Sequence, residues 1–235
     1  MIKQYPALLL ALFSSFSSAL TIDTMFLVSD DKGNGVITLT NDFEQRSFIQ
    51  SYITELRVNA QGELERIEYN ETNIDDWQLV TSVPKFILDP GVSKDIGFRS
   101  LCLPEVCAKD KDVMYSVSFE PSPYFEEGEE QSSIVSINYG YAPIFVVPTP
   151  NPKISYELTN NGNTILAHNT GNTVLTVLID QCTATVKNNC RLSEKLLAGR
   201  LRTINLPDSI QRNSLNVTVF NHDETYKRAE MLSLK

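Results

Sequence analysis

A long segment near the middle of the chain, residues 133–148 with the sequence SIVSINYGYAPIFVVP, constrains the fold more than any other. Its apolar and polar residues alternate, which is typical of a β-strand because successive side chains point to opposite faces. Four large side chains fall on one face: Val135, Ile137, Tyr139 and Tyr141. The acidic segment FEEGEEQSS precedes the strand and PTPNP follows it, which predicts a loop before it and a stiff joint after it. An apolar row of this kind either packs into its own domain or is offered to a partner strand.

The segments around this strand also fit β-structure. Residues 20–147 contain short apolar segments bounded by Asp, Asn and Gly turns, among them LTIDTMFLV, GVITLTN, SFIQSYITELRV and VMYSVSFEP. No segment has a sustained helical period, so we expect an antiparallel sandwich. Strand-like segments resume after residues 148–152, and residues 153–235 have the usual size of a second, smaller sandwich. Within them, LSEKLLAG fits either one helical turn or a strand.

Residues 1–19 have the features of a secretory signal peptide. Lys3 precedes the apolar segment ALLLALF, and residues 17–19 provide the small side chains of a signal peptidase site. A membrane anchor is the alternative, but the apolar run is shorter than the roughly 20 residues that span a bilayer. We therefore expect cleavage of this segment and an exported mature protein that begins near Leu20.

The mature chain is expected to be acidic. The whole chain has a formal net charge of −9 at pH 7, and loss of Lys3 with the signal peptide makes it −10. Nucleic acids and anionic membranes attract basic surfaces, so we expect neither as the main partner. No segment after the signal peptide is long and apolar enough to insert into a bilayer.

The cysteines occur as two close pairs, Cys102 with Cys107 and Cys182 with Cys190. In an exported protein this spacing predicts two local disulfides. A zinc site is the alternative, but neither pair has Cys-x-x-Cys spacing, and the chain has only two histidines to complete such a site. We expect no metal and no other cofactor.

The residues that could support catalysis do not form a recognisable set. A Ser or Cys nucleophile needs a histidine within hydrogen-bond reach. His168 and His222 each lie beside Asn, in segments that look like strand ends or turns. The chain also lacks a Gly-x-Ser-x-Gly elbow, a phosphate-binding glycine loop and a His-Glu-x-x-His motif. We expect no enzymatic activity, and a hydrolase that depends on one of these histidines is an alternative hypothesis.

Taken in order, these features resemble the PapD-like family of periplasmic pilus-assembly chaperones. The resemblance rests on the signal peptide and on these segments: VITLTN, SFIQSYITE, WQLVTSVPKFILDPG with Trp77, Pro84 and Phe86, DIGFR, YSVSFEPSP, FVVP at the joint, and VTVFNHDETY. It covers essentially the whole mature chain. The form INYGYAPIFVVP resembles the divergent, archaic branch of that family.

The resemblance implies an immunoglobulin-like domain at residues 20–147, a joint at residues 148–152 and a second such domain at residues 153–235. The partner would be a pilus or surface-fibre subunit that lacks its last strand and exposes an apolar groove. Residues 133–147 would be the donor strand that completes this subunit, a known mode of strand addition. The inserted row would be Val135, Ile137, Tyr139 and Tyr141. From the periplasm, the chaperone would deliver its subunit to an outer-membrane usher.

The usual carboxylate anchor of this family is missing. Typical members hold the subunit's C-terminal carboxylate with an Arg of the first strand and a Lys of the last strand of the first domain. Residues 20–31 contain no Arg or Lys, and no basic residue occurs between Lys111 and Lys153. A carboxylate in a partly dry site needs a cationic or amide partner. Four basic residues are candidates to replace the pair: Arg46, Arg57, Lys85 and Arg99. Arg99 matches the family's strand-terminal arginine, although an ion pair within its own domain is an equal alternative.

Other interpretations stay open at the level of sequence. The apolar row of residues 133–147 also fits the core of its own sandwich. A shift of one residue exchanges the two faces, so the inserted face is not fixed. A structural fibre subunit or adhesin would also lend or accept strands, but the mature start LTIDTMFLVSDD is too short for a separate donor extension. An exposed apolar edge also raises the question of whether the free protein covers it by forming a dimer.

Overall fold

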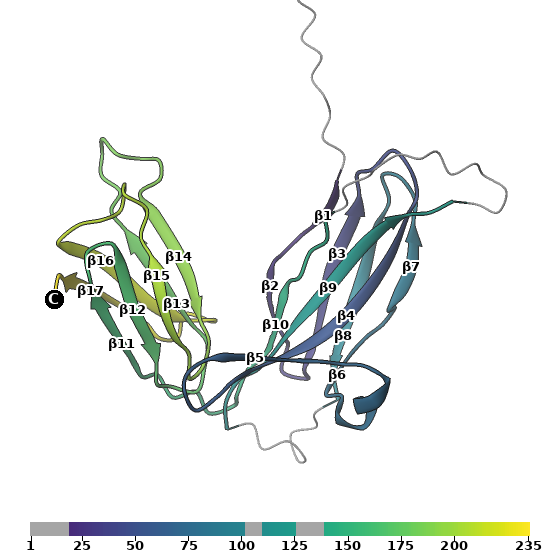
Figure 1. The fold of residues 1–235 in the computed structure, drawn as a ribbon, viewed down its shortest axis with the longest axis horizontal. Helices are drawn as coiled ribbons and strands as arrows, with labels where there is room; N and C mark the ends of the chain where they lie inside the picture. Colours follow the sequence, from purple (N-terminus) through teal and green to yellow (C-terminus); the bar gives the residue numbers. More distant parts are fainter. Residues whose placement is uncertain (1–18, 102–109, 126–138) are drawn as a thin grey trace, which may run out of the picture.

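The computed structural model describes residues 19–101, 110–125 and 139–235. These residues form two β-sandwiches that meet at one end and lean apart at the other (Figure 1). The prediction of an all-β chain with two immunoglobulin-like sandwich domains is confirmed. No helix in the described ranges is long and apolar enough to cross a membrane. Several predictions lie outside the described residues: the signal peptide up to residue 18, the Cys102–Cys107 bridge, and the roles of Val135 and Ile137.

The first sandwich is made of two sheets. One has the strand order β1-β3-β8-β6, and the other has the order β2-β10-β9-β4-β5 with β7 beside β4. The first of these sheets contains β1 (Leu20–Ile22), β3 (Asn34–Asn41), β8 (Ser93–Ser100) and β6 (Leu79–Thr81). The other contains β2 (Phe26–Val28), β10 (Ile144–Val147), β9 (Val113–Pro123), β4 (Ser47–Val58), β5 (Leu64–Glu68) and β7 (Lys85–Leu88). A short 3-10 helix, η1 (Glu71–Asp76), connects β5 to β6.

The second sandwich also has two sheets, of three and four strands. The smaller contains β11 (Tyr156–Asn160), β12 (Thr164–Asn169) and β15 (Leu201–Asn205). The larger contains β14 (Arg191–Leu196), β13 (Leu175–Asp180), β16 (Ser214–Asn221) and β17 (Lys227–Ser233). The ambiguous segment LSEKLLAG thus begins in a strand, β14. The predicted Cys182–Cys190 disulfide is present and closes the connection between β13 and β14.

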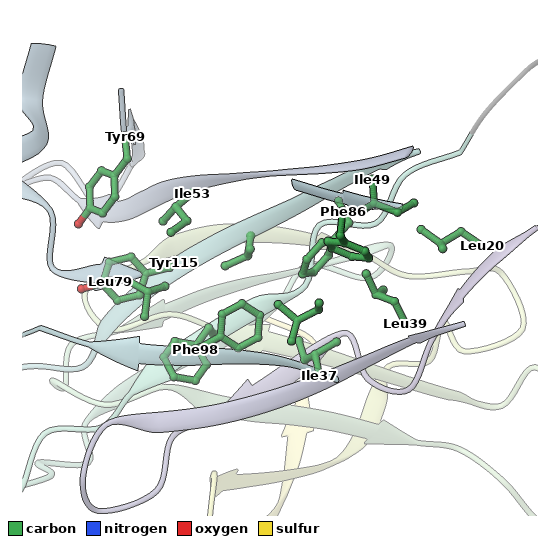
Figure 2. Close-up of a cluster of buried hydrophobic side chains, with 14 of the residues drawn as sticks. Leu20, Ile37, Leu39, Ile49, Ile53, Tyr69, Leu79, Phe86, Phe98 and Tyr115 are labelled. Atoms are coloured by element: carbon green, nitrogen blue, oxygen red, sulfur yellow. The ribbon is translucent and has the colours of Figure 1, made fainter. Parts of the chain in front are cut away.

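Period-two alternation builds a separate core in each sandwich. In β9, Tyr115, Val117 and Phe119 are fully buried. The opposite sheet contributes Ile37, Leu39 and Phe98 to the same cluster (Figure 2). Ile96 of this sheet belongs to the cluster as well. The core of the second sandwich is a different cluster, built mainly from β12, β13 and β16. Each domain therefore has its own apolar interior, as a domain that folds as a unit requires.

The first predicted strand is divided. The segment LTIDTMFLV, expected as one strand, forms β1 and β2, which belong to different sheets: β1 pairs with β3, and β2 pairs with β10. At the break, the hydroxyl of Thr24 accepts from the N–H of Phe26 (3.3 Å) and donates to its C=O (3.0 Å). The prediction of a single strand is wrong because alternation does not reveal that a chain changes sheets.

The described part of the predicted strand at residues 133–148 is interrupted. It is a strand from Ile144 to Val147, and an isolated bridge joins Tyr141 to Phe119 before that. Pro143 causes the interruption because it has no N–H to donate, although its C=O still accepts from Val117 N (3.0 Å). The segment keeps its place beside β9 from Tyr141 onward, but not as one continuous ladder.

Candidate functional site

The edge of β10 is covered by β2 along only part of its length. β2 pairs in parallel with β10 from Ile144 to Val146, and Ile144 N–H donates to Met25 O (3.0 Å). Before Ile144, Gly140 and Ala142 are exposed, and their backbone groups have no hydrogen-bond partner in the described part of the chain. We call residues 139–142 the open edge. An unpaired strand edge is a template for pairing with another chain.

Pro121 determines where the protein's own sheet stops. Tyr141 and Phe119 exchange two backbone hydrogen bonds, of 3.1 and 2.7 Å. In an antiparallel ladder the next such pair would be Tyr139 with Pro121, but proline has no N–H to donate. The opposite side of Pro121 pairs with Ile49 of β4, so the missing donor faces the open edge. β9 therefore cannot complete its ladder with Tyr139.

The two described members of the predicted apolar row have different environments. Tyr141 is partly buried and packs against the first core, because it lies opposite the buried Phe119. Tyr139 is 73% exposed. Between them the backbone passes very close to β9, since a Cβ on Gly140 would lie 2.5 Å from Phe119 O. Tyr141 thus serves its own domain, whereas Tyr139 is accessible to a partner.

The two domains meet beside the end of the open edge. Leu56, Met114 and Val146, on the outer face of the β4-β9-β10 sheet, form a buried cluster with Val174 of the second domain. Four partly buried side chains pack against this cluster: Phe26, Leu64, Ile144 and Leu197. We call these eight residues the domain junction. It consists of apolar groups from both domains, so it holds the two sandwiches together by burial of apolar surface.

Lys195 of β14 places a cation at the domain junction. Its ammonium lies 4.4 Å from the centre of the Phe26 ring and donates to Thr176 Oγ1 (2.8 Å). Burial lowers the pKa of Lys195, because the charged form loses contact with water. It forms no ion pair with any acidic residue in the described ranges. A partly dry ammonium with unused donors can bind a carboxylate.

Two of the basic residues considered from sequence, Arg99 and Lys85, lie away from the open edge, and a third, Arg46, forms an ion pair. Arg99 is exposed on β8, between the buried Phe98 and Ser100, and so points outward from the sheet that does not contain β10. Arg46 Nε donates to Asp89 (2.7 Å). Lys85 is exposed on β7, which is separated from β10 by β4 and β9.

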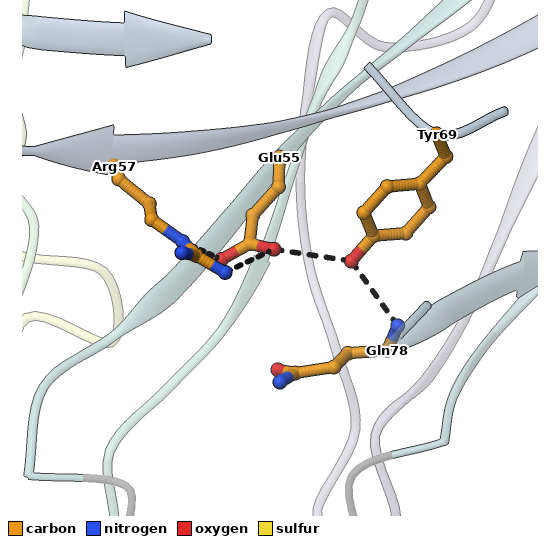
Figure 3. A network of polar contacts seen from close by, with 4 residues as sticks. All are labelled: Glu55, Arg57, Tyr69 and Gln78. Carbon is orange, nitrogen blue, oxygen red and sulfur yellow. Dashed lines mark hydrogen bonds and ion pairs between the residues drawn. The ribbon is translucent and has the colours of Figure 1, made fainter. Parts of the chain in front are cut away.

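Arg57, the fourth candidate, is tied to a buried carboxylate of its own strand (Figure 3). Its Nε and Nη2 donate to Glu55 at 2.6 and 3.0 Å, which holds the pKa of Arg57 above its ordinary value. Tyr69 Oη donates to the same carboxylate (3.2 Å) and accepts from Gln78 N (3.1 Å). Asp75 and Asp76 line the pocket beside this network. The acidic surroundings make this pocket a poor place for a second carboxylate.

Sequence reasoning missed Lys195, because its neighbour Phe26 is distant in the chain. The available signal was a basic residue directly before the apolar residues LLA in the segment LSEKLLAG. The described ranges contain no group of three or more His, Cys, Asp or Glu residues placed to hold a metal ion. His168 lies in β12, and His222 follows β16 in the other sheet of the second domain.

Solved structures with the same fold come from fimbrial systems. The class 5 fimbriae chaperone CfaA is 15% identical, with a TM-score of 0.55, over 92% of this chain and 100% of that chain. A chain from the Salmonella enterica SafA pilin–SafB chaperone complex is 11% identical, with a TM-score of 0.58, over 94% of this chain and 99% of that chain. A chain from the CsuC–CsuE chaperone–tip subunit complex of Acinetobacter baumannii is 11% identical, with a TM-score of 0.55, over 92% and 99% of the two chains. At these identities the likeness shows the fold, and the resemblance to pilus-assembly chaperones is confirmed at that level.

Comparison with curated protein sequences gave no match. The family model of the CS5 fimbrial protein N-terminal domain matches residues 22–148, which is more than half of the chain. The matched range contains almost all of the first sandwich, including the open edge and its Pro121. The chain therefore belongs to the CS5 fimbrial protein N-terminal domain family.

Proposed function

We propose that this protein is a periplasmic chaperone that binds subunits of a pilus or surface fibre by lending them a strand, and then delivers them to an outer-membrane usher. The observation that carries the proposal is the open edge, where Gly140 and Ala142 have unpaired backbone groups beside the exposed Tyr139. The likeness to CfaA, described as a fimbriae chaperone, and to a chain of the SafA pilin–SafB chaperone complex supports it.

The position of β2 suggests the orientation of the incoming strand. β2 runs parallel to β10 and covers its edge from Ile144 onward. A subunit strand on residues 139–142 would lie in line with β2, before Phe26. In the parallel orientation its C-terminal end would approach Phe26, over whose ring Lys195 places its ammonium.

Lys195 is accordingly our candidate for the residue that binds the subunit's terminal carboxylate, in place of Arg99. A cation that is already partly desolvated gains more from a carboxylate than an exposed one does. Binding would add a charge-assisted hydrogen bond to the one that Lys195 already makes with Thr176. Tyr139 would enter the subunit's groove, and we keep Val135 and Ile137 as its predicted companions.

The test compares two tyrosines on the same domain. Tyr139→Asp places a charge at the open edge, and Tyr52→Asp makes the same change at a 44% exposed tyrosine of β4. Each variant, and the wild type, is co-expressed in the periplasm with a tagged pilus subunit that lacks its last strand, and the recovered one-to-one complex is quantified. We expect Tyr139→Asp to reduce recovery about tenfold or more, because a buried charge in an apolar groove is costly, and Tyr52→Asp to leave it unchanged.

Lys195→Gln separates the anchor from the strand. It retains a side-chain hydrogen-bond donor without the charge, and we expect weaker binding of subunits with a free C-terminus but no change for subunits whose C-terminus is amidated. Equal recovery of all variants would contradict strand donation through this edge. Loss of a dimer of the free protein in Tyr139→Asp, seen by light scattering, would indicate that the same edge caps itself.

A further inference from the structure

A buried carboxylate links the two domains and their joint. Asp112, directly before β9, is only 3% exposed. It accepts from Thr149 N (2.8 Å), in the joint. It also accepts from Thr173 Oγ1 (2.9 Å) and Val174 N (2.7 Å), in the second domain. One side chain therefore bonds to three separate donors, one in the joint and two in the second domain.

The joint has few other groups that could be fixed in this way. Residues 148–152 have the sequence PTPNP, so Thr149 and Asn151 are its only residues with a backbone N–H. Thr149 is 5% exposed, and its buried N–H requires an acceptor. Asp112 supplies that acceptor. The prolines limit the backbone angles of the joint, and the carboxylate fixes where the joint lies against the first domain.

Asn172 reinforces the same contact. Its backbone C=O accepts from Asp112 N (2.9 Å), and its side chain donates to Asp110 O and to Asn151 O. Its Oδ1 accepts from Lys153 N. The connection between β12 and β13 is thus bound to the first domain and to both sides of the joint.

The position of Lys195 depends on this arrangement. Lys195 belongs to the second domain, and Phe26, over which its ammonium lies, belongs to the first. A rotation of one domain against the other would separate these two groups. We infer that Asp112 is a positioning residue: it fixes the angle between the domains and so holds Lys195 beside the end of the open edge. This inference rests on the proposed function only for its consequence for subunit binding.

The test measures the angle and the binding separately. Spin labels are attached at two exposed positions in different domains, Val36→Cys in β3 and Met231→Cys in β17. The distribution of distances between them is recorded by pulsed electron paramagnetic resonance. Asp112→Asn keeps the size of the side chain but replaces an acceptor by a donor that faces N–H and O–H groups. We expect a single narrow distribution for the parent and a broad one for Asp112→Asn. If only about one molecule in ten retains the binding-competent angle, subunit affinity falls about tenfold.

Asp223→Asn is the matched control. Asp223 also accepts two hydrogen bonds, from Thr225 N (3.1 Å) and Thr225 Oγ1 (2.8 Å), but within one turn of the second domain. Its variant should keep the narrow distribution and the parent affinity. Thr173→Val removes one donor to Asp112 with little change of shape, and should broaden the distribution less.

An unchanged distribution in folded Asp112→Asn would overturn the inference, as would equal broadening in Asp223→Asn. Should Asp112→Asn fail to fold, Thr173→Val decides by the same criterion. Failure of the parent to bind any subunit would remove the proposed function, yet the distance measurement would still show whether Asp112 fixes the angle.

Discussion

The two sandwiches differ in how their edges are closed. In the second domain the chain after β17 returns to β11: Leu234 forms a bridge with Asn160, and Lys235 N donates to Asn160 O (3.0 Å). Tyr156 and Tyr226 meet edge to face across the same side, with ring centres 6.5 Å apart. In the first domain β2 covers β10 only from Ile144 onward. Closed edges resist pairing with other chains, and open ones promote it.

This difference shows that two sandwiches can close one side differently: β14 and β15 end their sheets in the second domain, but its β11–β17 side is closed by the chain after β17. Both domains are built from the same alternation of apolar and polar residues, and both bury a continuous core. The first domain divides its initial strand between two sheets and places Pro121 opposite Tyr139, which leaves residues 139–142 without a partner. In the second domain the chain after β17 pairs with Asn160 of β11. Substitutions at the open edge of the first domain should therefore change subunit binding, and substitutions at the closed β11–β17 side should change the stability of the second domain.

The largest loss of stability should come from truncating a core side chain of β10. Phe145 is fully buried and packs on Phe98, with ring centres 5.2 Å apart. Phe145→Ala should lower the free energy of unfolding of the first domain by about 3–5 kcal/mol, through lost burial and a cavity. Trp77 is the only tryptophan and lies in the first domain, so its fluorescence in urea reports on that domain alone.

Ile179→Ala, in the core of the second domain, is the control for Phe145→Ala. It should shift the transition followed by far-ultraviolet circular dichroism more than the one followed by Trp77 fluorescence. Identical shifts in both signals for both variants would mean that the two domains unfold as one unit, and that the comparison of separate edges does not extend to separate stabilities.

The regular parts of the fold could be predicted from the sequence because alternation is a local property. The segment SFIQSYITELRV coincides with β4, and the buried face of β9 follows from its alternating apolar residues. The division of LTIDTMFLV could not be predicted in the same way. Its two halves have equally good strand patterns, and only the positions of β3 and β10 decide which sheet each half joins.

The proposed site follows from the sequence at its strand edge, but not at its charged residues. The position of Tyr139 beside a strand edge follows from the pattern around residues 133–148. Lys195 was missed because its partner Phe26 is brought near by the docking of two domains, which no local pattern encodes. Asp112 was missed for the same reason. A general signal for both is a charged residue directly beside a strongly apolar segment, DVMYSVSF for one and EKLLAG for the other.

Loosening the closed β11–β17 side of the second domain should lower its free energy of unfolding by an intermediate amount. Asn160 is fully buried, and its side chain donates to Arg212 O (3.1 Å) and accepts from Gly162 N (2.9 Å). Asn160→Ala should cost about 1–3 kcal/mol, because buried backbone groups lose their partners. Hydrogen exchange at the amides of Leu234 and Lys235 should accelerate as the edge loosens.

Asn169→Ala is the matched control for Asn160→Ala. Asn169 is equally buried and bonds to Thr173 O (2.8 Å) and Leu196 O (3.0 Å), at the end of the domain that faces the joint. It should lose a similar free energy of unfolding without faster exchange at Leu234 and Lys235. Faster exchange at these amides in both variants would show that the closure of this edge reflects the stability of the whole domain.

The smallest effect is a dependence of first-domain stability on high pH. Burial raises the pKa of Tyr69 to about 12, and its ring stacks on Trp77 with centres 5.5 Å apart. In the unfolded chain a tyrosine loses its proton near pH 10. Between about pH 10 and 12 the folded state therefore holds a proton that the unfolded state has lost, so the free energy of unfolding falls as pH rises. The slope should stay below about 1 kcal/mol per pH unit, measured by urea unfolding with Trp77 fluorescence.

Tyr69→Phe should flatten this pH dependence, whereas Tyr226→Phe, in the second domain, should not. A slope unchanged by Tyr69→Phe would place the alkaline sensitivity of the first domain elsewhere, with the fully buried Tyr115 as the next residue to test.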